Sequence, residues 1–419
     1  MISAREAALL TLNDIFYNGA YSNLAVKEML GKCRGMDKNE KAFYTGLVYG
    51  IVSRHFTLEY IISKYSSVKV KKLARYVKIL LEMGIYQLLF LDKVPQSAAV
   101  NESVKLAKKY CKKGSDRFVN AILRAFCKDG CKFDIPDALD VKYSFSPEMT
   151  EIFCEQFGAE FSEQLMSALN EAPDFLIRPN ILKTDAVTLS QMLTENGINN
   201  AVTDYGMIKA DGFDVSSSPL YRDGLFSVQD RGAYTASVVL DPKKGETVID
   251  MCAAPGGKTT HIAELMSDSG KVLAFDIHEH KISLIQNTAK RLGIESVAAK
   301  VGDATILQEN LVSTADKVLC DVPCSGWGII RRKPDIKFSH TDLEELYEIQ
   351  RKIIRNGAQY VKKGGSLVYS TCTVNKNENE KVISDFLKDN NDFEKVYEKT
   401  YYPHIDGCDG FFICRLDKK

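Results

Sequence analysis

Short apolar runs alternate with helical segments from residue 245 toward the C-terminus, and this alternation constrains the fold more than any other feature of the chain. A strand, a helix and a second strand in succession form a βαβ unit, in which the two strands are parallel. The carboxyl ends of such strands meet at one edge of the sheet, where α/β proteins bind ligands. We therefore expect a Rossmann-like α/β domain with strands near residues 246–251, 271–276, 296–301, 316–321 and 366–371.

The last two strand-like runs, residues 393–401 and 410–416, have no helical segment between them. Parallel neighbours need a long crossover connection, whereas antiparallel neighbours can be joined by a short turn. An antiparallel hairpin is therefore expected to close the sheet.

The first third of the chain has a different pattern. Between residues 4 and 126 apolar residues recur at spacings of three and four, which predicts an all-α bundle, and we take residues 1–130 as the first domain. This domain carries 22 Lys and Arg against 11 Asp and Glu, although the whole chain is balanced at 55 against 55. The surplus favours a polyanionic partner such as RNA; an ordinary solvated helical surface is the alternative.

Two clusters hold much of this positive charge, and they are the candidate RNA-facing surfaces. The second cluster is on a predicted helix that follows Pro95 and ends at Gly114. The clusters are Lys69, Lys71, Lys72 and Arg75, and Lys105, Lys108, Lys109, Lys112 and Lys113.

Residues 140–228 are predicted to form a small α+β connecting module. A helical segment at about 147–171 leads to a strand-like run at 174–184, followed by a helix and short strands. Pro179 lies inside that run and cannot donate a hydrogen bond to a neighbouring strand, so we expect a sheet edge or a bulge there. With the α/β domain at 229–419, the chain is expected to be a multidomain protein.

The composition also excludes some classes of protein. The most apolar stretch, residues 79–91, is interrupted by Glu82, Gly84 and Gln87 and is too short to span a bilayer. The N-terminus lacks the pattern of a secretory signal. We therefore expect a cytoplasmic protein without membrane contact.

The 11 cysteines are odd in number, widely spread and never spaced as CxxC. This usage is typical of reduced thiols rather than of a disulfide framework or a tight zinc site. His278 and His280 are interpreted as exposed turn residues, and no metal is expected.

A glycine-rich turn, DMCAAPGGKTT at residues 250–260, follows the first predicted strand of the α/β domain. Gly256 and Gly257 would let backbone amides approach a ligand, and the N-terminus of the next helix adds partial positive charge. A triphosphate-binding loop would need glycine where this chain has Cys252, and the dinucleotide motif GxGxxG is absent. Both of those nucleotide classes are disfavoured.

Acidic residues come at the ends of the next strands. Asp276 ends the second strand, 20 residues after Gly256, where a carboxylate can hold ribose hydroxyls. Asp303 follows the third strand and is placed to accept the amino group of adenine. Together with the turn, this ordered set indicates a pocket for an adenosyl ligand, S-adenosylmethionine.

Two cysteines follow the fourth and fifth strands: Cys324 in DVPCSGWG (321–328) and Cys372 in STCTVNKNENE (370–380). Thiols beside a methyl donor suit methylation of carbon 5 of a pyrimidine, because a thiolate that adds to carbon 6 makes carbon 5 nucleophilic. Release of the product then needs a base and a second thiol. Asp321 would hydrogen-bond N3 and the exocyclic amine of the ring, which favours cytosine.

These motifs resemble those of the NOL1/NOP2/Sun family of RNA cytosine-5 methyltransferases. The resemblance extends over nearly the whole chain, including IIRRKPDIKF (329–338) and DGFFI (409–413). Within the family, the chain is most similar to bacterial members that act on 16S ribosomal RNA and begin with a domain similar to the antitermination factor NusB. The resemblance implies an enzyme for 16S ribosomal RNA, and we expect this enzyme to be a monomer. We also expect its substrate to be unassembled small-subunit RNA, because the target base must be unstacked.

By position, the resemblance makes Cys372 the nucleophile and Cys324 the residue that assists enzyme release. It also places Asp321 and Lys258 beside the reacting cytosine. The implied contacts to S-adenosylmethionine are Cys252, Ala253, Ala254, Pro255, Gly256, Gly257, Lys258, Asp276, Asp303 and Asp321.

Some residues depart from the family pattern or have two interpretations. In VQDRGAYTAS (228–237) the QD pair matches the family, whereas Arg231 and Gly232 stand where small or acidic residues are more usual. Trp327, the only tryptophan, could stack on a base or anchor its loop by packing.

Three other functions are alternatives to methylation of cytosine in 16S ribosomal RNA. A methyltransferase for exocyclic amines would need Asp or Asn, Pro, Pro and an aromatic residue where this chain has Asp-Val-Pro-Cys at 321–324. A non-catalytic RNA-binding or antitermination-like factor would use the helical domain alone, and the intact cofactor motifs disfavour it. Another RNA substrate, such as transfer RNA, stays open.

Overall fold

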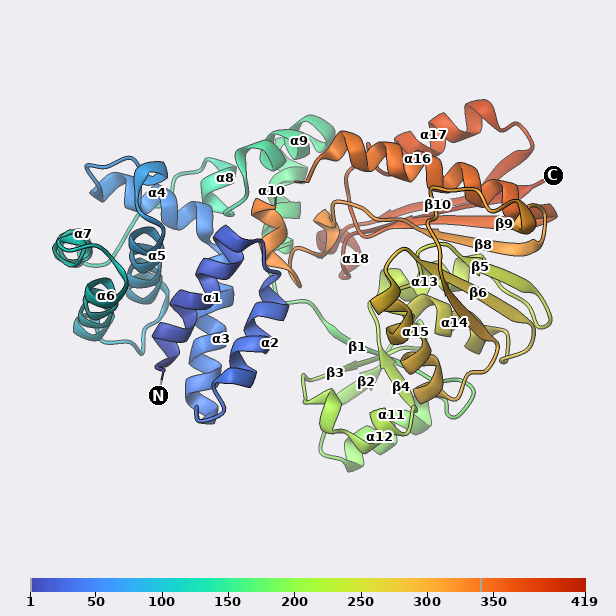
Figure 1. The fold of residues 1–419 in the computed structure, drawn as a ribbon, viewed down its shortest axis with the longest axis horizontal. Helices are drawn as coiled ribbons and strands as arrows, with labels where there is room; N and C mark the ends of the chain where they lie inside the picture. Colours follow the sequence, from blue (N-terminus) through green and yellow to red (C-terminus); the bar gives the residue numbers. More distant parts are fainter. Residues whose placement is uncertain (1, 340) are drawn as a thin grey trace. The chain divides into compact units, whose positions relative to one another are not determined.

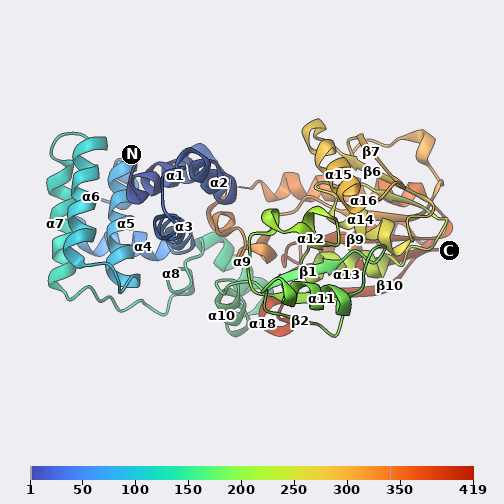
Figure 2. The same cartoon turned by 90° about the horizontal axis from the view of Figure 1, so that it is seen from below.

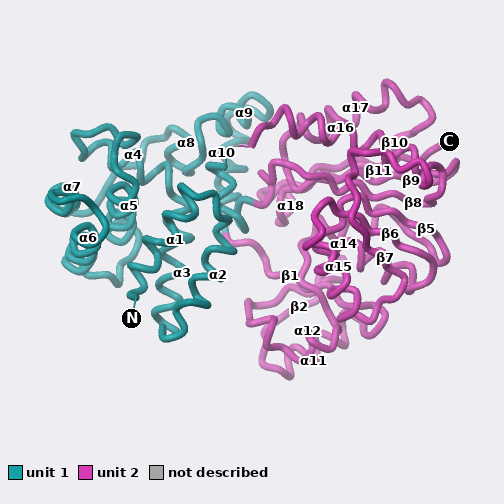
Figure 3. Tube along the Cα trace, viewed as in Figure 1, with its two compact units in different colours: residues 1–171, 330–339 teal, residues 172–329, 340–419 magenta. Residues whose placement is uncertain are grey.

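The computed structural model describes residues 2–339 and 341–419, which divide into two compact units (Figure 1, Figure 3). Unit 1 comprises residues 1–171 and 330–339, and unit 2 comprises residues 172–329 and 340–419. The expected connecting module of residues 140–228 is divided between them: its helical residues up to 171 belong to unit 1, and its strands and later helices belong to unit 2. The three-domain division by residue number therefore remains a proposal. Among the described residues, helices that combine the length and the apolarity of a membrane span are absent.

Unit 1 is helical, which confirms the prediction for residues 4–126. The basic helix ends at Tyr110, before the predicted Gly114, which instead precedes the next helix with φ 93°. The helices of unit 1 are α1 (Ala4–Asn18), α2 (Ser22–Lys32), α3 (Lys38–Ser53), α4 (His55–Tyr65), α5 (Arg75–Phe90), α6 (Gln96–Tyr110), α7 (Ser115–Lys128), α8 (Leu139–Lys142), α9 (Pro147–Phe157) and α10 (Ala159–Ala168).

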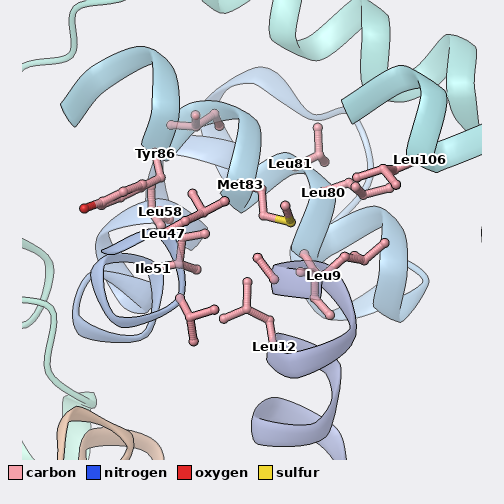
Figure 4. Close-up of a cluster of buried hydrophobic side chains, with 14 of the residues drawn as sticks. Leu9, Leu12, Leu47, Ile51, Leu58, Leu80, Leu81, Met83, Tyr86 and Leu106 are labelled. Atoms are coloured by element: carbon pink, nitrogen blue, oxygen red, sulfur yellow. The ribbon is translucent and has the colours of Figure 1, made fainter. Parts of the chain in front are cut away.

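Helix α5 is the centre of this unit and packs against α1, α3, α4, α6 and α7; α6 and α7 lie side by side in both views (Figure 1, Figure 2). Its residues from Ile79 to Gln87 are buried on every side, as expected for a helix enclosed by others. Leu80, Leu81 and Met83 pack among side chains of α1, α3 and α4 (Figure 4). A side chain at Gly84 would meet Leu123 at 2.6 Å, so glycine here permits the close approach of α7.

Unit 1 also contains a segment from far along the chain, residues 330–339, which includes the short helix η5 (Pro334–Phe338). Lys337 is 1% exposed and its Nζ donates to Ser53 O (2.9 Å), Tyr143 O (3.2 Å) and Asn170 Oδ1 (2.5 Å). Burial holds the pKa of Lys337 well below its ordinary value. The ring of Phe338 lies 5.3 Å from that of His55. We refer to residues 330–339 as the inserted segment.

The smaller sheet of unit 2 has the order β2–β3–β1–β4, all antiparallel. The expectation of an edge or a bulge at Pro179 is wrong, because β1 is an inner strand and Pro179 is its last residue, where Asn180 N–H continues the ladder to Leu225 O (2.8 Å). Its elements are β1 (Phe175–Pro179), α11 (Ala186–Glu195), β2 (Asn200–Val202), β3 (Ile208–Ala210), α12 (Pro219–Arg222) and β4 (Phe226–Val228).

The larger sheet has seven strands in the order β10–β11–β9–β8–β5–β6–β7. All five predicted parallel strands are present, and β10 and β11 form the predicted antiparallel hairpin at one end. The strands are β5 (Thr247–Asp250), β6 (Lys271–Asp276), β7 (Val297–Val301), β8 (Ala315–Asp321), β9 (Val361–Thr371), β10 (Phe393–Tyr401) and β11 (Phe411–Lys418). The helices are α13 (Arg231–Leu240), α14 (Gly257–Leu265), α15 (Glu279–Leu292), α16 (Leu343–Tyr360), α17 (Glu380–Asp389) and α18 (Pro403–Asp406).

Both faces of this sheet are covered by helices (Figure 1). Successive strand residues point to opposite faces, so Val318 packs in the core beneath α16 and α17, and Leu319 packs in the core beneath α13, α14 and α15. Two apolar cores thus enclose the sheet and leave the carboxyl ends of its parallel strands as the polar edge.

A buried ion pair joins the smaller sheet to α14. Arg178 in β1 and Glu264 in α14 are 1% and 0% exposed, and their Nη2 and Oε1 atoms are 2.7 Å apart. Arg178 Nη1 donates also to Gln229 Oε1 (2.6 Å) and to Gly257 O (2.7 Å), at the first turn of α14. This arginine therefore fixes the start of α14 from the neighbouring sheet.

We predict that Arg178→Met lowers the free energy of unfolding by about 3–5 kcal/mol, because it leaves the Glu264 carboxylate buried without its partner. The double variant Arg178→Met/Glu264→Met should recover a large part of that loss. Urea unfolding measures both, with the exposed Arg222→Met as the matched control. Equal losses in the single and the double variant would contradict the prediction.

Candidate active site

A cavity of about 470 Å³ opens at the carboxyl edge of the larger sheet. Residues at the ends of β5, β6, β7 and β8 line it, together with Ile349 and Ile353 of α16. Its volume is within the usual range for pockets that bind small ligands. Among the predicted cofactor residues, those that line the cavity are Cys252, Ala254, Asp276, Asp303 and Asp321.

The glycine-rich turn shapes one wall of this cavity. Gly256 has φ 102°, a left-handed conformation that favours glycine, and a side chain there would meet Ile285 Cα at 3.1 Å. The turn leads into α14 at Gly257. Ala253, Pro255, Gly256, Gly257 and Lys258 do not line the cavity, so a contact of these residues with the cofactor stays a prediction.

The two carboxylates beyond this turn are themselves fixed by backbone amides. Asp276 Oδ1 accepts from His278 N–H (3.0 Å), and its Oδ2 accepts from Ala254 N–H (3.3 Å). Asp303 Oδ1 accepts from the N–H (2.8 Å) and the hydroxyl (2.6 Å) of Thr305. Both carboxylates are thus held at the cavity wall, where they suit the ribose hydroxyls and the amino group of an adenosyl ligand.

Asp321 lines this cavity at the end of β8, three positions before Cys324. Its Oδ2 accepts from Lys258 Nζ (2.7 Å) and its Oδ1 from Ser370 Oγ (2.8 Å). Although burial opposes the charge of Lys258, Asp321 outweighs this effect and raises the pKa of Lys258 above its ordinary value. The lysine ammonium is thereby held at the end of β8.

The two cysteines of the sequence prediction are brought together. Cys324 follows β8 and Cys372 follows β9, and their Sγ atoms are 3.3 Å apart. Both side chains are partly exposed. The adjacent Cys372 sulfur, burial and the charge of Glu378 raise the pKa of Cys324 well above its ordinary value.

The loop after Cys324 is anchored close to Cys372. Trp327 is 6% exposed, which favours the interpretation of a packed loop anchor over base stacking. Gly328 N–H donates to Cys372 O (3.0 Å), and a side chain at Gly328 would meet Gly410 O at 1.9 Å. Glycine at 328 therefore lets the loop pack against the DGFFI stretch predicted to belong to the family pattern.

Several residues of this region have no distinctive signal in the sequence. Ile349 and Ile353 are spaced like any buried helix stripe, so the sequence could not assign them to a cavity. Arg178 lies inside a predicted strand, and its charge was the only indication that it could have a role other than packing. Glu378 belongs to the STCTVNKNENE motif at 370–380, and its side chain is 0% exposed.

A group of possible metal ligands lies elsewhere, in unit 1. Single ligand atoms of His55, Glu59 and Glu82 lie within 4.8 Å of one another. Lys78 forms an ion pair with Glu59, and His55 contacts both carboxylates. The expectation of no metal stays a prediction.

Asp250 at the end of β5 generates a prediction about pH. It is 1% exposed, accepts from Thr259 Oγ1 (2.7 Å), and burial raises its pKa to about 7. Because the folded state binds this proton more tightly than the unfolded state, its contribution to stability is full at low pH and is lost as pH rises through about 7. Wild type should lose about 2 kcal/mol of stability relative to Asp250→Asn between about pH 5.5 and about pH 8.

Urea unfolding at the two pH values tests this expectation. The exposed Asp204→Asn is the control and should retain the pH dependence of wild type. Parallel pH profiles for wild type and Asp250→Asn would show that this carboxyl has no such role.

Comparison with known proteins places the chain in a family. Residues 2–128 match the NusB family, and residues 237–417 match the family described as 16S rRNA methyltransferase RsmB/F. The chain is 36% identical to the probable ribosomal RNA small subunit methyltransferase B of Bacillus subtilis, over 100% of this chain and 99% of that protein. It is 31% identical to ribosomal RNA small subunit methyltransferase B of Klebsiella pneumoniae, again over 100% and 99%.

Solved structures agree with this assignment. The crystal structure of PH0851 is 27% identical, has a TM-score of 0.83, and is matched over 98% of this chain and 97% of that chain. A methyltransferase homolog protein from Pyrococcus horikoshii is 29% identical with a TM-score of 0.60, over 68% of this chain and 99% of that chain. These findings confirm the predicted resemblance and fold class. The chain belongs to the RsmB/F family of 16S ribosomal RNA methyltransferases, whose methyl donor is S-adenosylmethionine, and it begins with a NusB-family domain.

Proposed function

We propose that this enzyme methylates carbon 5 of a cytosine in 16S ribosomal RNA through a covalent adduct between Cys372 and carbon 6. The observation that carries the proposal is the pair of sulfur atoms 3.3 Å apart beside the adenosyl-sized cavity. Carbon 5 of cytosine needs nucleophilic activation before it can accept a methyl group, whereas an exocyclic amine does not need a thiol.

The proposed reaction uses both thiols in order. When bound, S-adenosylmethionine supplies an electrophilic methyl group. The Cys372 thiolate adds to carbon 6 and moves an electron pair to carbon 5, which takes the methyl group. A base then removes the proton from carbon 5, the bond between carbon 6 and sulfur breaks, and the ring becomes aromatic again. Cys324 is assigned to this release step because its sulfur adjoins the departing one.

Asp321 and Lys258 are proposed to hold the cytosine and the developing charge on it. Asp321 already accepts from Lys258 and Ser370, so both of its oxygens are oriented before RNA binds. Such prior orientation favours the transition state because little reorganisation is left for the reaction itself. The Lys258 ammonium also favours a thiolate in its surroundings.

The helical unit is proposed to bind the RNA phosphates. All nine lysines and arginines of the two predicted basic clusters are exposed. Of these, Lys105 pairs with Glu102 and Lys109 with Glu6, whereas the cluster at residues 69–75 forms no ion pair with the described residues. Exposed cations in clusters supply sequence-independent affinity for a phosphate backbone.

The substrate is proposed to be unassembled small-subunit RNA in the cytoplasm, with the enzyme acting as a monomer. A base must leave its stack before two thiols and a methyl donor can reach its ring, and free RNA allows this more readily than an assembled particle.

One prediction from the proposed function concerns the covalent adduct between Cys372 and the RNA. Cys324→Ala, incubated with S-adenosylmethionine and 16S RNA, should accumulate a protein–RNA adduct that survives denaturing gel electrophoresis, because release is impaired. The double variant Cys324→Ala/Cys372→Ala should form none, since it lacks the nucleophile. Absence of an adduct in both, while wild type still makes 5-methylcytosine, would mean that the two thiol roles are wrongly assigned.

The second prediction concerns the state of the RNA. Methyl transfer to naked 16S RNA should be at least about tenfold faster than to intact small subunits, because the target base is more accessible. Initial rates with labelled methyl donor measure this, and transfer RNA serves as the competing substrate. Equal rates on RNA and subunits would exclude the unassembled substrate, and a faster rate on transfer RNA would exclude 16S specificity.

A further inference from the structure

Glu378 lies in the segment between β9 and α17, and its side chain is completely buried. Its Oε2 accepts from Ser325 N–H (2.8 Å) and from Gln350 Nε2 (3.0 Å). Its Oε1 accepts from Ser325 Oγ (2.5 Å) and from Asn375 Nδ2 (3.1 Å). Each carboxylate oxygen therefore has two donors.

These donors connect Glu378 to both cysteine loops. Ser325 follows Cys324 directly, and its hydroxyl lies 2.8 Å from that of Thr373, which follows Cys372 directly. Gln350 of α16 also donates to Pro323 O (3.0 Å), on the other side of Cys324. The carboxylate is thus the common acceptor of a network that fixes the two loops against each other.

The chemical type of this residue calls for an explanation. A buried carboxylate is costly unless it is paired, and the described contacts of Glu378 come from neutral groups only. An amide side chain of the same length would turn its NH2 group toward two of these donors, whereas a carboxylate accepts from all four. The network therefore needs an acceptor on both sides, and a carboxylate supplies it together with a negative charge.

The negative charge of Glu378 also acts on the two neighbouring thiols. Two sulfur atoms 3.3 Å apart do not both ionise readily, because like charges at this distance repel each other. The pair retains a proton, and its position decides which sulfur is the nucleophile. Around this pair the charged groups are distributed unevenly: Glu378 is behind the Cys324 loop, and Lys258, bound to Asp321, is electrostatically coupled to Cys372.

We propose that Glu378 is a positioning residue that holds Cys324 against Cys372 and, through its negative charge, keeps the shared proton on Cys324 so that the thiolate forms on Cys372. The assignment rests on the proposed function, because it concerns which of the two thiols attacks the base. The titratable groups that act on Cys324 are Cys372 after β9, Glu378 from the segment before α17, and Tyr369 from β9. The raised pKa of Cys324 agrees with this arrangement.

Site-resolved alkylation of the full-length protein tests the proposal without RNA or methyl donor. Iodoacetamide labelling at about pH 7.5, followed by peptide mass spectrometry, gives separate rates for Cys324 and Cys372. In wild type Cys372 should react faster. In Glu378→Gln the rate at Cys324 should rise at least about fivefold, because removal of the charge makes its thiolate easier to form.

Glu380→Gln is the matched control, because it is the same substitution two positions away, and Glu380 Oε1 accepts from Thr400 on β10. It should leave both alkylation rates unchanged. Glu378→Asp keeps the charge and should retain the wild-type order of the two cysteines. Faster labelling of Cys324 than of Cys372 in wild type would overturn the proposal even if Glu378→Gln fails to fold.

Methylation kinetics give a second readout. Glu378→Gln should lower kcat about tenfold and leave KM for the RNA unchanged, because the network holds the two cysteine loops and contains no residue of the basic clusters. Unchanged alkylation of Cys324 in Glu378→Gln would overturn the role of the charge. Failure of the proposed function is seen separately, as a missing adduct in Cys324→Ala, since alkylation does not depend on the substrate.

Discussion

The register between β8 and β9 is the constraint on which the active site depends. The strands are parallel and pair Asp321 with Ser370, so the chain leaves both strands at the same level of the sheet. Cys324 comes three positions after Asp321 and Cys372 two positions after Ser370, which allows their sulfur atoms to meet. A slip of one residue would point Ser370 to the other face of the sheet and remove its hydrogen bond to Asp321. The distance between the two sulfur atoms of the candidate site therefore depends first on the pairing of β8 with β9, and only then on the loops that follow these strands.

Buried charge recurs around this site, and in each case it joins elements that are distant in sequence. Arg178 joins the smaller sheet to the first turn of α14, and Glu378 joins the two cysteine loops to α16. Buried charges are expensive, and apolar residues would pack at lower cost. Their directional hydrogen bonds, however, fix the position of a loop more closely than non-directional apolar contacts can. In this chain, buried polar networks fix the positions of loops, whereas apolar cores hold the helices against the sheet.

The sequence predicted the parts of the fold that depend on local pattern. Strand and helix periodicity located all five parallel strands and the C-terminal hairpin, and topology then placed Asp276, Asp303 and both cysteines at one edge. It could not predict contacts between polar residues far apart in the chain, such as Arg178 with Glu264. Pro179 was misjudged because only the strand order shows that β1 is an inner strand whose last residue is the proline. Glu378 was hidden for the same reason, since its partner Ser325 is 53 positions away.

The inserted segment has a consequence for how the gene can be divided. Unit 1 takes residues 330–339 from the middle of the part of the chain that forms the larger sheet, and Lys337 satisfies acceptors on three separate parts of the helical unit. A boundary drawn after residue 171 would therefore leave the helical unit without a piece of its own interior. It would also leave Lys337 in residues 172–419, without the acceptors that it has in the helical unit. The two units of this chain are consequently not separable by a single cut, because residues 330–339 belong to the helical unit although they follow residue 171.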